Sequence, residues 1–356
     1  MPVAGGYLGG VPGADGESLE STPDVIAARA GLRYLSDDRR GVRRRRRGRG
    51  FSYHRDDGRP IGDVLRLRIA ELAIPPAWRD VWIALEADAH LQATGFDDRG
   101  RKQYLYHPLW REEADVAKFE RLASFAGGLV ALRRQVAADM ASDGRDRLCA
   151  AAVRLIDECL IRPGSRRHFE ANGSVGATTL RSDHVEIRRD LIMLDFVGKG
   201  GADHHLELRD RQLAKTLGEL LDSARRRDAL FASCSGATID EVCLNRYIEE
   251  HAGEGFTAKD LRTWGATTTV VGELADKRSI TDGTAADATV RAAVEVAAAA
   301  LGNTPAVGRA SYVAPAVIDA NRSGALADVW RRTRPGRWLS RAERATDRVL
   351  GDAAQG

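Results

Sequence analysis

The chain has 356 residues, of which 43% are hydrophobic and 29% are charged, and its formal net charge is +3. This length allows one large domain or two moderate ones, and this composition argues against wholesale disorder. The first residues lack the pattern of a secretory signal, and the apolar run 292–301 is too short to span a bilayer. We therefore expect a protein of the cytoplasm with no membrane segment.

Positive charge is concentrated in two segments of the chain. Residues 33–49 hold nine arginines against two aspartates, and residues 331–348 hold seven arginines against two acidic residues. Such segments commonly contact phosphate backbones, although many are simply solvated arms. The four cysteines form no C-x-x-C pair, so we expect buried free thiols rather than a zinc site or a disulfide framework.

The first part of the chain predicts a small β-rich domain. Residues 1–49 are expected to be a flexible leader followed by an arginine-rich arm. Residues 50–111 show strand-like patterns at 51–54, 81–85, 90–96 and 102–107, with a short helix at 63–72. This segment is expected to form the N-terminal domain.

From residue 112 the hydrophobic period becomes helical, which predicts a second domain over residues 112–322. Within it we expect a helix at 145–161, a meander of three strands over 178–208, and a last strong helix at 285–301. Residues 323–356 are expected to be a basic C-terminal tail. The predicted fold class is α+β, with a mostly helical second domain that contains a small three-stranded sheet.

Four short motifs in the second domain carry residue types suited to cutting a phosphodiester. They are Ile161-Arg162-Pro163-Gly164, Phe196-Val197-Gly198-Lys199, Lys259-Asp260-Leu261-Arg262, and Gly302-Asn303-Thr304-Pro305 running on to Ser311-Tyr312. Each motif alone is weak, because an arginine after a helix or a lysine in a turn is usually solvated. Their order along the chain is the more specific signal.

The chemistry of phosphodiester cleavage gives each residue type a role. Negative charge gathers on the non-bridging oxygens as a fifth oxygen approaches, and Arg162 and Arg262 offer bidentate, permanent positive charge to stabilise it. The phenol of Tyr312 is the candidate nucleophile, and nearby cations favour its ionised form. The leaving oxygen needs a proton, which arginine releases poorly and lysine can supply. Two of the six lysines, Lys199 and Lys259, lie in these motifs, and a third, Lys102, lies in a strand motif described below.

The series Arg, Lys, Lys-x-x-Arg and Tyr resembles the catalytic series of the type IB DNA topoisomerases, particularly their compact poxvirus and bacterial branch. The resemblance covers about residues 51–320. It implies that Tyr312 forms a 3′-phosphotyrosine, that Lys199 acts as the general acid, and that supercoils relax without ATP, a cofactor or a metal. Lys259 and Arg262 are three apart on a predicted helix and can face one phosphate. Asn303 stands where well-known members carry histidine, and an amide donates a hydrogen bond without supplying charge.

Residues 100–107, with the sequence GRKQYLYH, resemble the strand with which the same family contacts DNA. Strand alternation puts Lys102, Tyr104 and Tyr106 on one face. The resemblance implies a major-groove contact by Gln103, Tyr104 and Tyr106, whereas the alternative is that the two tyrosines pack into a sheet core. The expected partner is supercoiled duplex DNA, held by a monomeric clamp at the nucleoid.

Two other functions remain open at this point. A tyrosine recombinase shares the catalytic logic, but recombinases usually show His-x-x-Arg where this chain has Lys259-x-x-Arg262, and their first domain is usually helical. A DNA-binding protein without catalysis would use the same basic surfaces.

Overall fold

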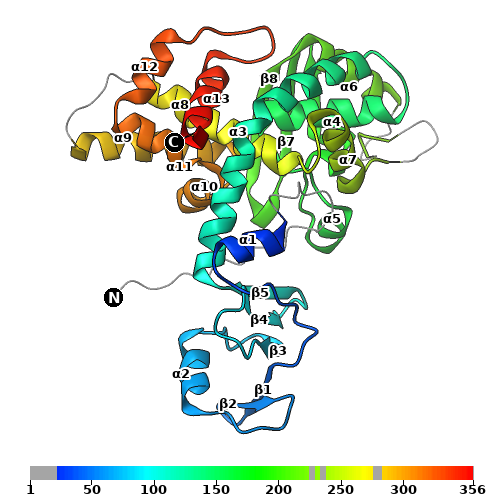
Figure 1. The fold of residues 1–356 in the computed structure, drawn as a ribbon. Helices are drawn as coiled ribbons and strands as arrows, with labels where there is room; N and C mark the ends of the chain where they lie inside the picture. The colour runs from blue at the N-terminus through cyan, green and yellow to red at the C-terminus, as the bar shows by residue number, and fades with distance from the viewer. Residues whose placement is uncertain (1–21, 224–228, 233–237, 276–282, 356) are drawn as a thin grey trace. The chain divides into compact units, whose positions relative to one another are not determined.

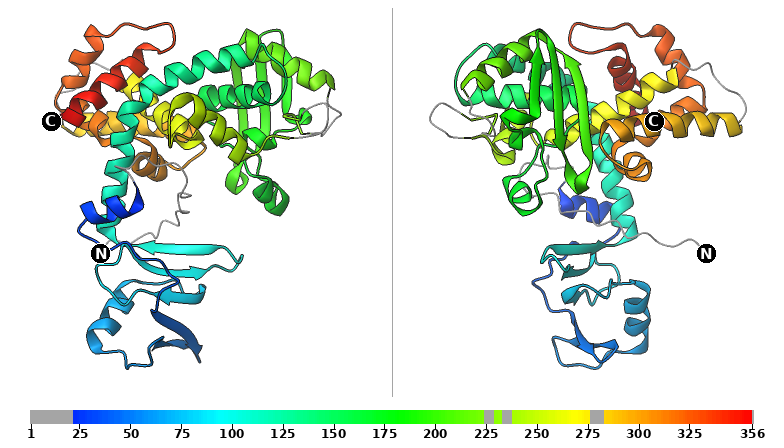
Figure 2. Two further views of the ribbon diagram at one scale, coloured as in Figure 1. Left: turned by 45° about the vertical axis from the view of Figure 1, so that its right-hand side comes forward. Right: turned by 180° about the vertical axis from the view of Figure 1, so that it is seen from behind.

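The computed structural model describes residues 22–223, 229–232, 238–275 and 283–355, in two compact units that divide after Lys118. Figures 1 and 2 show a β-rich first unit and a mostly helical second unit that contains a small sheet, which confirms the predicted α+β fold class. Within the described ranges, no helix is both long and apolar enough to cross a membrane.

The first unit contains an antiparallel sheet of five strands in the order β2-β1-β3-β4-β5. The elements of this unit are α1 (Pro23–Arg29), β1 (Val42–Arg47), β2 (Gly50–Arg55), α2 (Asp63–Glu71), β3 (Arg79–Ile83), β4 (Leu91–Phe96) and β5 (Lys102–Tyr106). On one face, Val42 and Ile83 form a core with Ile69 of α2. On the other, Trp82 packs with Leu35. The two faces therefore follow strand alternation.

Residues 42–47 form strand β1, whereas the sequence analysis placed them in an arginine-rich arm. Val42 and Arg44 face the covered side of the sheet, and Arg43 and Arg45 are exposed. The Arg44 guanidinium donates hydrogen bonds to three backbone carbonyls at 2.7 to 3.2 Å and lies 4.2 Å from the centroid of the Phe51 ring. Because these hydrogen bonds offset the cost of burying the Arg44 guanidinium, a run of arginines can form a strand whose side chains alternate between a buried and an exposed face.

Helix α3 (Pro108–Asp139) begins in the first unit and continues into the second. The other elements of the second unit are α4 (Arg145–Cys159), α5 (Arg166–Asn172), β6 (Val185–Arg188), β7 (Leu191–Val197), β8 (Asp203–Arg209), α6 (Arg211–Ser223), α7 (Glu241–Ala252), α8 (Ala258–Ala275), α9 (Gly283–Ala300), α10 (Pro305–Tyr312), α11 (Pro315–Arg322), α12 (Ala325–Arg332) and α13 (Arg341–Gln355). Strands β6, β7 and β8 form the predicted three-stranded antiparallel meander.

Helix α8 is the central scaffold of the second unit. Twelve of its side chains are buried, on all sides of the helix, and α4, α9, α10 and α13 pack around it. Gly265 leaves room for Leu160 at the end of α4, because a Cβ atom there would overlap a methyl group of Leu160 unless that side chain shifted. A helix buried all round holds its side chains in fixed positions.

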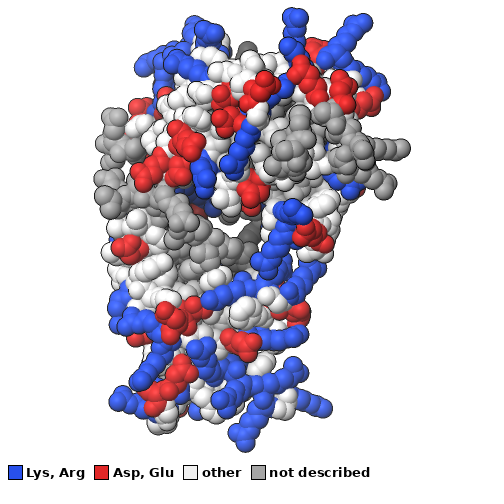
Figure 3. Space-filling model, turned by 90° about the vertical axis from the view of Figure 1, so that its right-hand side faces the viewer, with Lys and Arg blue, Asp and Glu red and all other residues white. Residues whose placement is uncertain are grey.

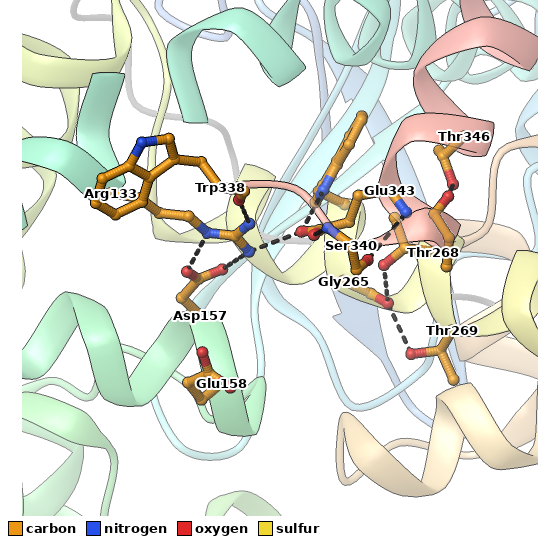
Figure 4. A network of polar contacts seen from close by, with 12 residues as sticks. Arg133, Asp157, Glu158, Gly265, Thr268, Thr269, Trp338, Ser340, Glu343 and Thr346 are labelled. Atoms are coloured by element: carbon orange, nitrogen blue, oxygen red, sulfur yellow. Dashed lines mark hydrogen bonds and ion pairs between the residues drawn. The ribbon is translucent and has the colours of Figure 1, made fainter. Parts of the chain in front are cut away.

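The C-terminal segment is folded onto α8, whereas the sequence analysis expected a basic tail there. Ala345, Val349 and Leu350 of α13 belong to the main core. Figure 4 shows how Arg133 of α3 joins Asp157 of α4 to Glu343 of α13, with N to O distances of 2.7 Å to each carboxylate. The segment contains an amphipathic helix whose apolar face is buried, although its many arginines suggest a charged tail in the sequence.

Three of the four cysteines lie in the described part of the chain as free thiols. Cys149 and Cys243 are buried, as predicted, and Cys159 is partly exposed. Cys234 lies outside the described residues.

Candidate active site

The Arg162 side chain is positioned by the end of helix α4. Leu160 has a φ of 53°, a left-handed conformation that ends the helix and turns the chain toward Arg162. The Arg162 Nη2 atom donates a hydrogen bond to Oδ1 of Asn303 at 2.6 Å, which joins two segments 141 residues apart. The first and fourth predicted motifs are therefore neighbours in space.

The motif at residues 302–305 is a helix end followed by a helix start. Gly302 has a φ of 62°, and the backbone amide of Asn303 donates a hydrogen bond to the Ala298 carbonyl at 2.9 Å. Together they end α9. Thr304 then caps α10 through its side chain, and Pro305 occupies the first turn. This pair of signals fixes Asn303 in the short link between α9 and α10.

Arg262, on α8, links the ends of two helices to the candidate nucleophile. Its Nε donates to the Leu160 carbonyl at 2.7 Å, its Nη2 to the Leu301 carbonyl at 2.9 Å, and its Nη1 to Tyr312 Oη at 3.2 Å. Only 2% of Arg262 is exposed. No carboxylate pairs with it within the described ranges, and burial lowers its pKa to about 10. The guanidinium thus remains charged at neutral pH and is available to an anion.

Tyr312 is the last residue of α10 and is held against α8. The Thr267 hydroxyl donates to the Tyr312 carbonyl at 3.0 Å and accepts from the Ala314 amide at 3.3 Å. Burial alone would raise the pKa of the Tyr312 phenol. The charges of Arg262, Arg162 and Lys259 outweigh burial and lower that pKa below its ordinary value. The site therefore makes the phenolate, which is the nucleophilic form, easier to reach than in an isolated tyrosine.

The two predicted lysines lie in different settings. Lys259 is exposed on the first turn of α8, one turn before Arg262, and its charge acts on Tyr312. Lys199 is exposed at the tip of the hairpin that connects β7 to β8. Among the described residues, no three His, Cys, Asp or Glu side chains form a group that could hold a metal ion.

His204 of β8, which belongs to none of the motifs described above, lies beside the site. Its ring stacks on Phe196 and contacts both Gly198 and Gly302, which precede Lys199 and Asn303. Burial lowers the pKa of His204, and the charges of Arg162 and Arg262 lower it further. A histidine in a strand, without a spacing motif, gives no signal in the sequence that would have revealed this position.

Comparisons with known proteins show the family to which this chain belongs. A family model described as the catalytic core of eukaryotic DNA topoisomerase I matches residues 107–323, and one described as the N-terminal domain of bacterial DNA topoisomerase IB matches residues 50–97. The chain belongs to the type IB DNA topoisomerase family. Members of this family are isomerases that act on DNA, so the recombinase alternative loses its support.

Two relatives of this topoisomerase IB chain come from viruses. A mimivirus protein named DNA topoisomerase 1B is 30% identical over 236 residues, which cover 64% of this chain and 70% of the viral one. The vaccinia virus (strain Copenhagen) protein of the same name is 24% identical over 259 residues, which cover 72% of this chain and 80% of the viral one. These relatives support the predicted likeness to compact members of the family.

The four residues predicted to contact DNA all lie on β5, at one edge of the first sheet. Lys102 pairs with Asp37 at 2.6 Å, and the buried Gln103 donates to Asp97 at 2.9 Å. Tyr104 and Tyr106 stack with ring centroids 6.1 Å apart, so they share a face as predicted.

Tyr106 also belongs to the aromatic packing of the first unit. Its ring stacks on Trp110 with centroids 4.5 Å apart, and burial raises the pKa of its phenol to about 12. Tyr106 is therefore partly a packing residue, while its neutral hydroxyl can still donate a hydrogen bond.

Proposed function

We propose that this topoisomerase IB family member relaxes supercoiled duplex DNA through a transient single-strand cut, with Tyr312 as the covalent partner of the scissile phosphate. The observation that carries the proposal is the contact between Arg262 Nη1 and Tyr312 Oη at 3.2 Å, in a buried site where the arginine has no carboxylate partner in the described chain. A phosphate brought to Tyr312 meets the positive charge of Arg262, which no carboxylate of the described residues neutralises.

In the proposed reaction, a bond forms between Tyr312 Oη and phosphorus while the bond from phosphorus to the 5′ oxygen breaks. The phenol proton passes to solvent, and Lys199 gives a proton to the leaving oxygen. Arg162 and Arg262 stabilise the two non-bridging oxygens, with Lys259 nearby. The phosphotyrosine conserves the energy of the broken linkage, so religation reverses these steps and needs no ATP.

We further propose that the enzyme works as a monomer on duplex DNA at the nucleoid, in the cytoplasm. All six proposed catalytic residues come from a single chain and a single unit. The proposed contacts with the DNA duplex by Lys102, Gln103, Tyr104 and Tyr106 belong to the first unit.

The test of this function is relaxation of negatively supercoiled plasmid by the purified protein in EDTA and without ATP. We expect complete relaxation through a ladder of topoisomers, and a covalent adduct on Tyr312 after denaturation with detergent. A product that is only nicked, or relaxation that requires ATP, would contradict the proposal. The plasmid carries no recombination site, so a strand transferase acting on paired sites would leave it supercoiled.

Asn303 is expected to donate a hydrogen bond to the phosphate in place of the histidine of other members. Its Oδ1 is occupied by Arg162, and its buried Nδ2 has no partner among the described residues. Asn303→Ala should slow single-turnover cleavage by roughly 10²-fold, which is typical of losing one preorganised donor. Asn303→Asp should slow it further, because a carboxylate repels the phosphate. Cleavage by Asn303→Ala within threefold of the native rate would contradict this role.

The exposed arginines of β1 are expected to contact the DNA backbone. In Figure 3, Lys and Arg side chains gather at the lower end of the view, at the level of β1 and β2 in Figure 1. Arg45, Arg46 and Arg47 are exposed, and none of them forms an ion pair within the described ranges. Their charge is therefore available to DNA phosphates.

Replacing these three arginines with glutamine should weaken DNA binding and reduce the slope of log K against log salt by about 2 to 3, since each phosphate contact contributes about 0.9. Fluorescence anisotropy with labelled duplex between 50 and 200 mM salt, roughly the range over which such contacts are lost, measures both quantities. Arg331→Gln is the control, because that exposed arginine is paired with Asp328. An unchanged slope in the triple variant would place these arginines away from the DNA.

A further inference from the structure

The imidazole of His204 touches both segments that carry the proposed general acid and the proposed amide donor. A Cβ atom on Gly198 would lie 2.6 Å from His204 Nε2, and one on Gly302 would lie 2.7 Å from Cε1. Contacts this short do not occur in folded proteins, so glycine at both positions makes room for the ring. Gly198 precedes Lys199, and Gly302 precedes Asn303.

The ring of His204 is itself held in place by its neighbours. It pairs across the hairpin with Phe196, and the two rings stack with centroids 4.8 Å apart and planes 13° apart. Burial and the two active-site arginines lower the pKa of His204, so the imidazole is neutral near pH 7. The ring therefore contributes packing, and no positive charge, beside the hydrogen-bonded pair of Arg162 and Asn303.

We propose that His204 is a positioning residue, which sets the hairpin tip carrying Lys199 against the corner of the active site formed by Arg162 and Asn303. The inference rests on the proposed function, in which Lys199 protonates the leaving oxygen. His204 acts through Lys199 and does not touch the DNA.

The hairpin is the side of this contact that should move when the ring is removed. Asn303 is fixed by its own backbone hydrogen bond to Ala298 and by Arg162. The hairpin tip is exposed and contains Gly200 and Gly201, which have φ values of 78° and 80°. Glycine at two successive positions leaves this tip with a large conformational freedom, which the contact with His204 restricts.

The experiment compares single-turnover cleavage of two duplexes by the full chain. One has the ordinary 5′ oxygen at the scissile phosphate, and the other has sulfur in its place. A thiolate leaves without a proton, since thiols have a pKa near 8.5, whereas an alkoxide needs the acid. We expect His204→Ala to cleave the oxygen substrate at least tenfold more slowly than the native protein, and the sulfur substrate within threefold of the native rate.

Three variants complete the design. His204→Phe keeps a flat ring on Phe196 and should restore most of the oxygen cleavage. His205→Ala, the adjacent and exposed histidine of β8, should leave both rates unchanged. Gly198→Ala, where φ is an ordinary −90°, should reproduce the selective oxygen defect because its methyl group displaces the ring.

The outcomes separate the inference from the function on which it rests. Equal slowing of both substrates by His204→Ala, or no slowing of either, overturns the positioning role while cleavage by the native protein stands. If His204→Ala does not fold, Gly198→Ala gives the same decision, because equal slowing or no slowing there also overturns it. If the native protein forms no covalent adduct with either duplex, the proposed function itself fails.

Discussion

Replacing Tyr312 with phenylalanine is expected to abolish both DNA relaxation and the covalent adduct while duplex binding is retained. The substitution removes the only atom that attacks phosphorus in the proposed reaction, and it leaves Arg162 and Arg262 in place to bind phosphate. Plasmid relaxation, adduct formation on radiolabelled duplex and binding by anisotropy measure the three quantities. Binding should stay within about threefold of the native value, because each of these cations still faces the site.

Tyr247→Phe is the matched control for this experiment. Tyr247 is buried like Tyr312, with exposures of 3% and 8%, and its hydroxyl donates to Asp139 at 2.6 Å. Its removal should cost about 1.5 to 3 kcal/mol of folding stability, typical of a hydrogen bond to a charged group, and leave relaxation intact. If Tyr312→Phe still relaxes plasmid and Tyr247→Phe does not, the nucleophile has been misplaced.

Replacing Glu343 with alanine should lower the free energy of unfolding by about 3 kcal/mol. One oxygen of Glu343 accepts from Arg133 at 2.7 Å, and the other accepts from the Ser340 amide at 2.7 Å, at the start of α13. Removing one member of a buried ion pair typically costs about 3 to 5 kcal/mol. We expect the lower end because Asp157 still pairs with Arg133. Urea unfolding followed by circular dichroism measures the change.

The control for Glu343 is Asp328→Ala, which removes an exposed ion pair with Arg331 and should cost less than about 1 kcal/mol. A similar loss in both variants would contradict a special role for the network of Figure 4.

The stabilisation by Glu343 should also depend on pH. Although burial raises the pKa of Glu343, hydrogen bonds from Arg133 and Ser340 outweigh it and hold that pKa below its ordinary value of 4.5. The stabilisation is therefore full above pH 4.5 and is lost as pH falls through the lower folded pKa. The stability difference between the native protein and Glu343→Gln should shrink in that range.

The elements that the sequence predicted best are those with a clear hydrophobic period. Strands β2 to β5 and helix α4 lie within a few residues of their predicted limits. The meander β6 to β8 has the predicted three strands, but it begins at Val185 rather than at residue 178. The motif at 302–305 also indicated its local structure, because glycine ends one helix while threonine and proline begin the next. Local signals of this kind depend on neighbouring residues and can be recognised in one chain.

Features that depend on distant partners could not be predicted in this way. Strand β1 is arginine-rich, and its inward Arg44 is satisfied by carbonyls some thirty residues later in the chain. Helix α13 buries its apolar face against α8, which is distant in the sequence, and its many charged residues suggest a solvated segment instead. The position of His204 could not be predicted for the same reason, since its neighbours Gly198 and Gly302 come together only in the folded chain.

The hydroxyl of Thr267 has a consequence for the cut DNA. It holds the backbone that directly follows the side chain of the proposed nucleophile, through the carbonyl of Tyr312 and the amide of Ala314. A 3′ end esterified to this tyrosine would be anchored to the buried helix α8. The 5′-hydroxyl end, once it has left the phosphorus, would carry no such attachment, so the rotation that removes supercoils would take place at that end.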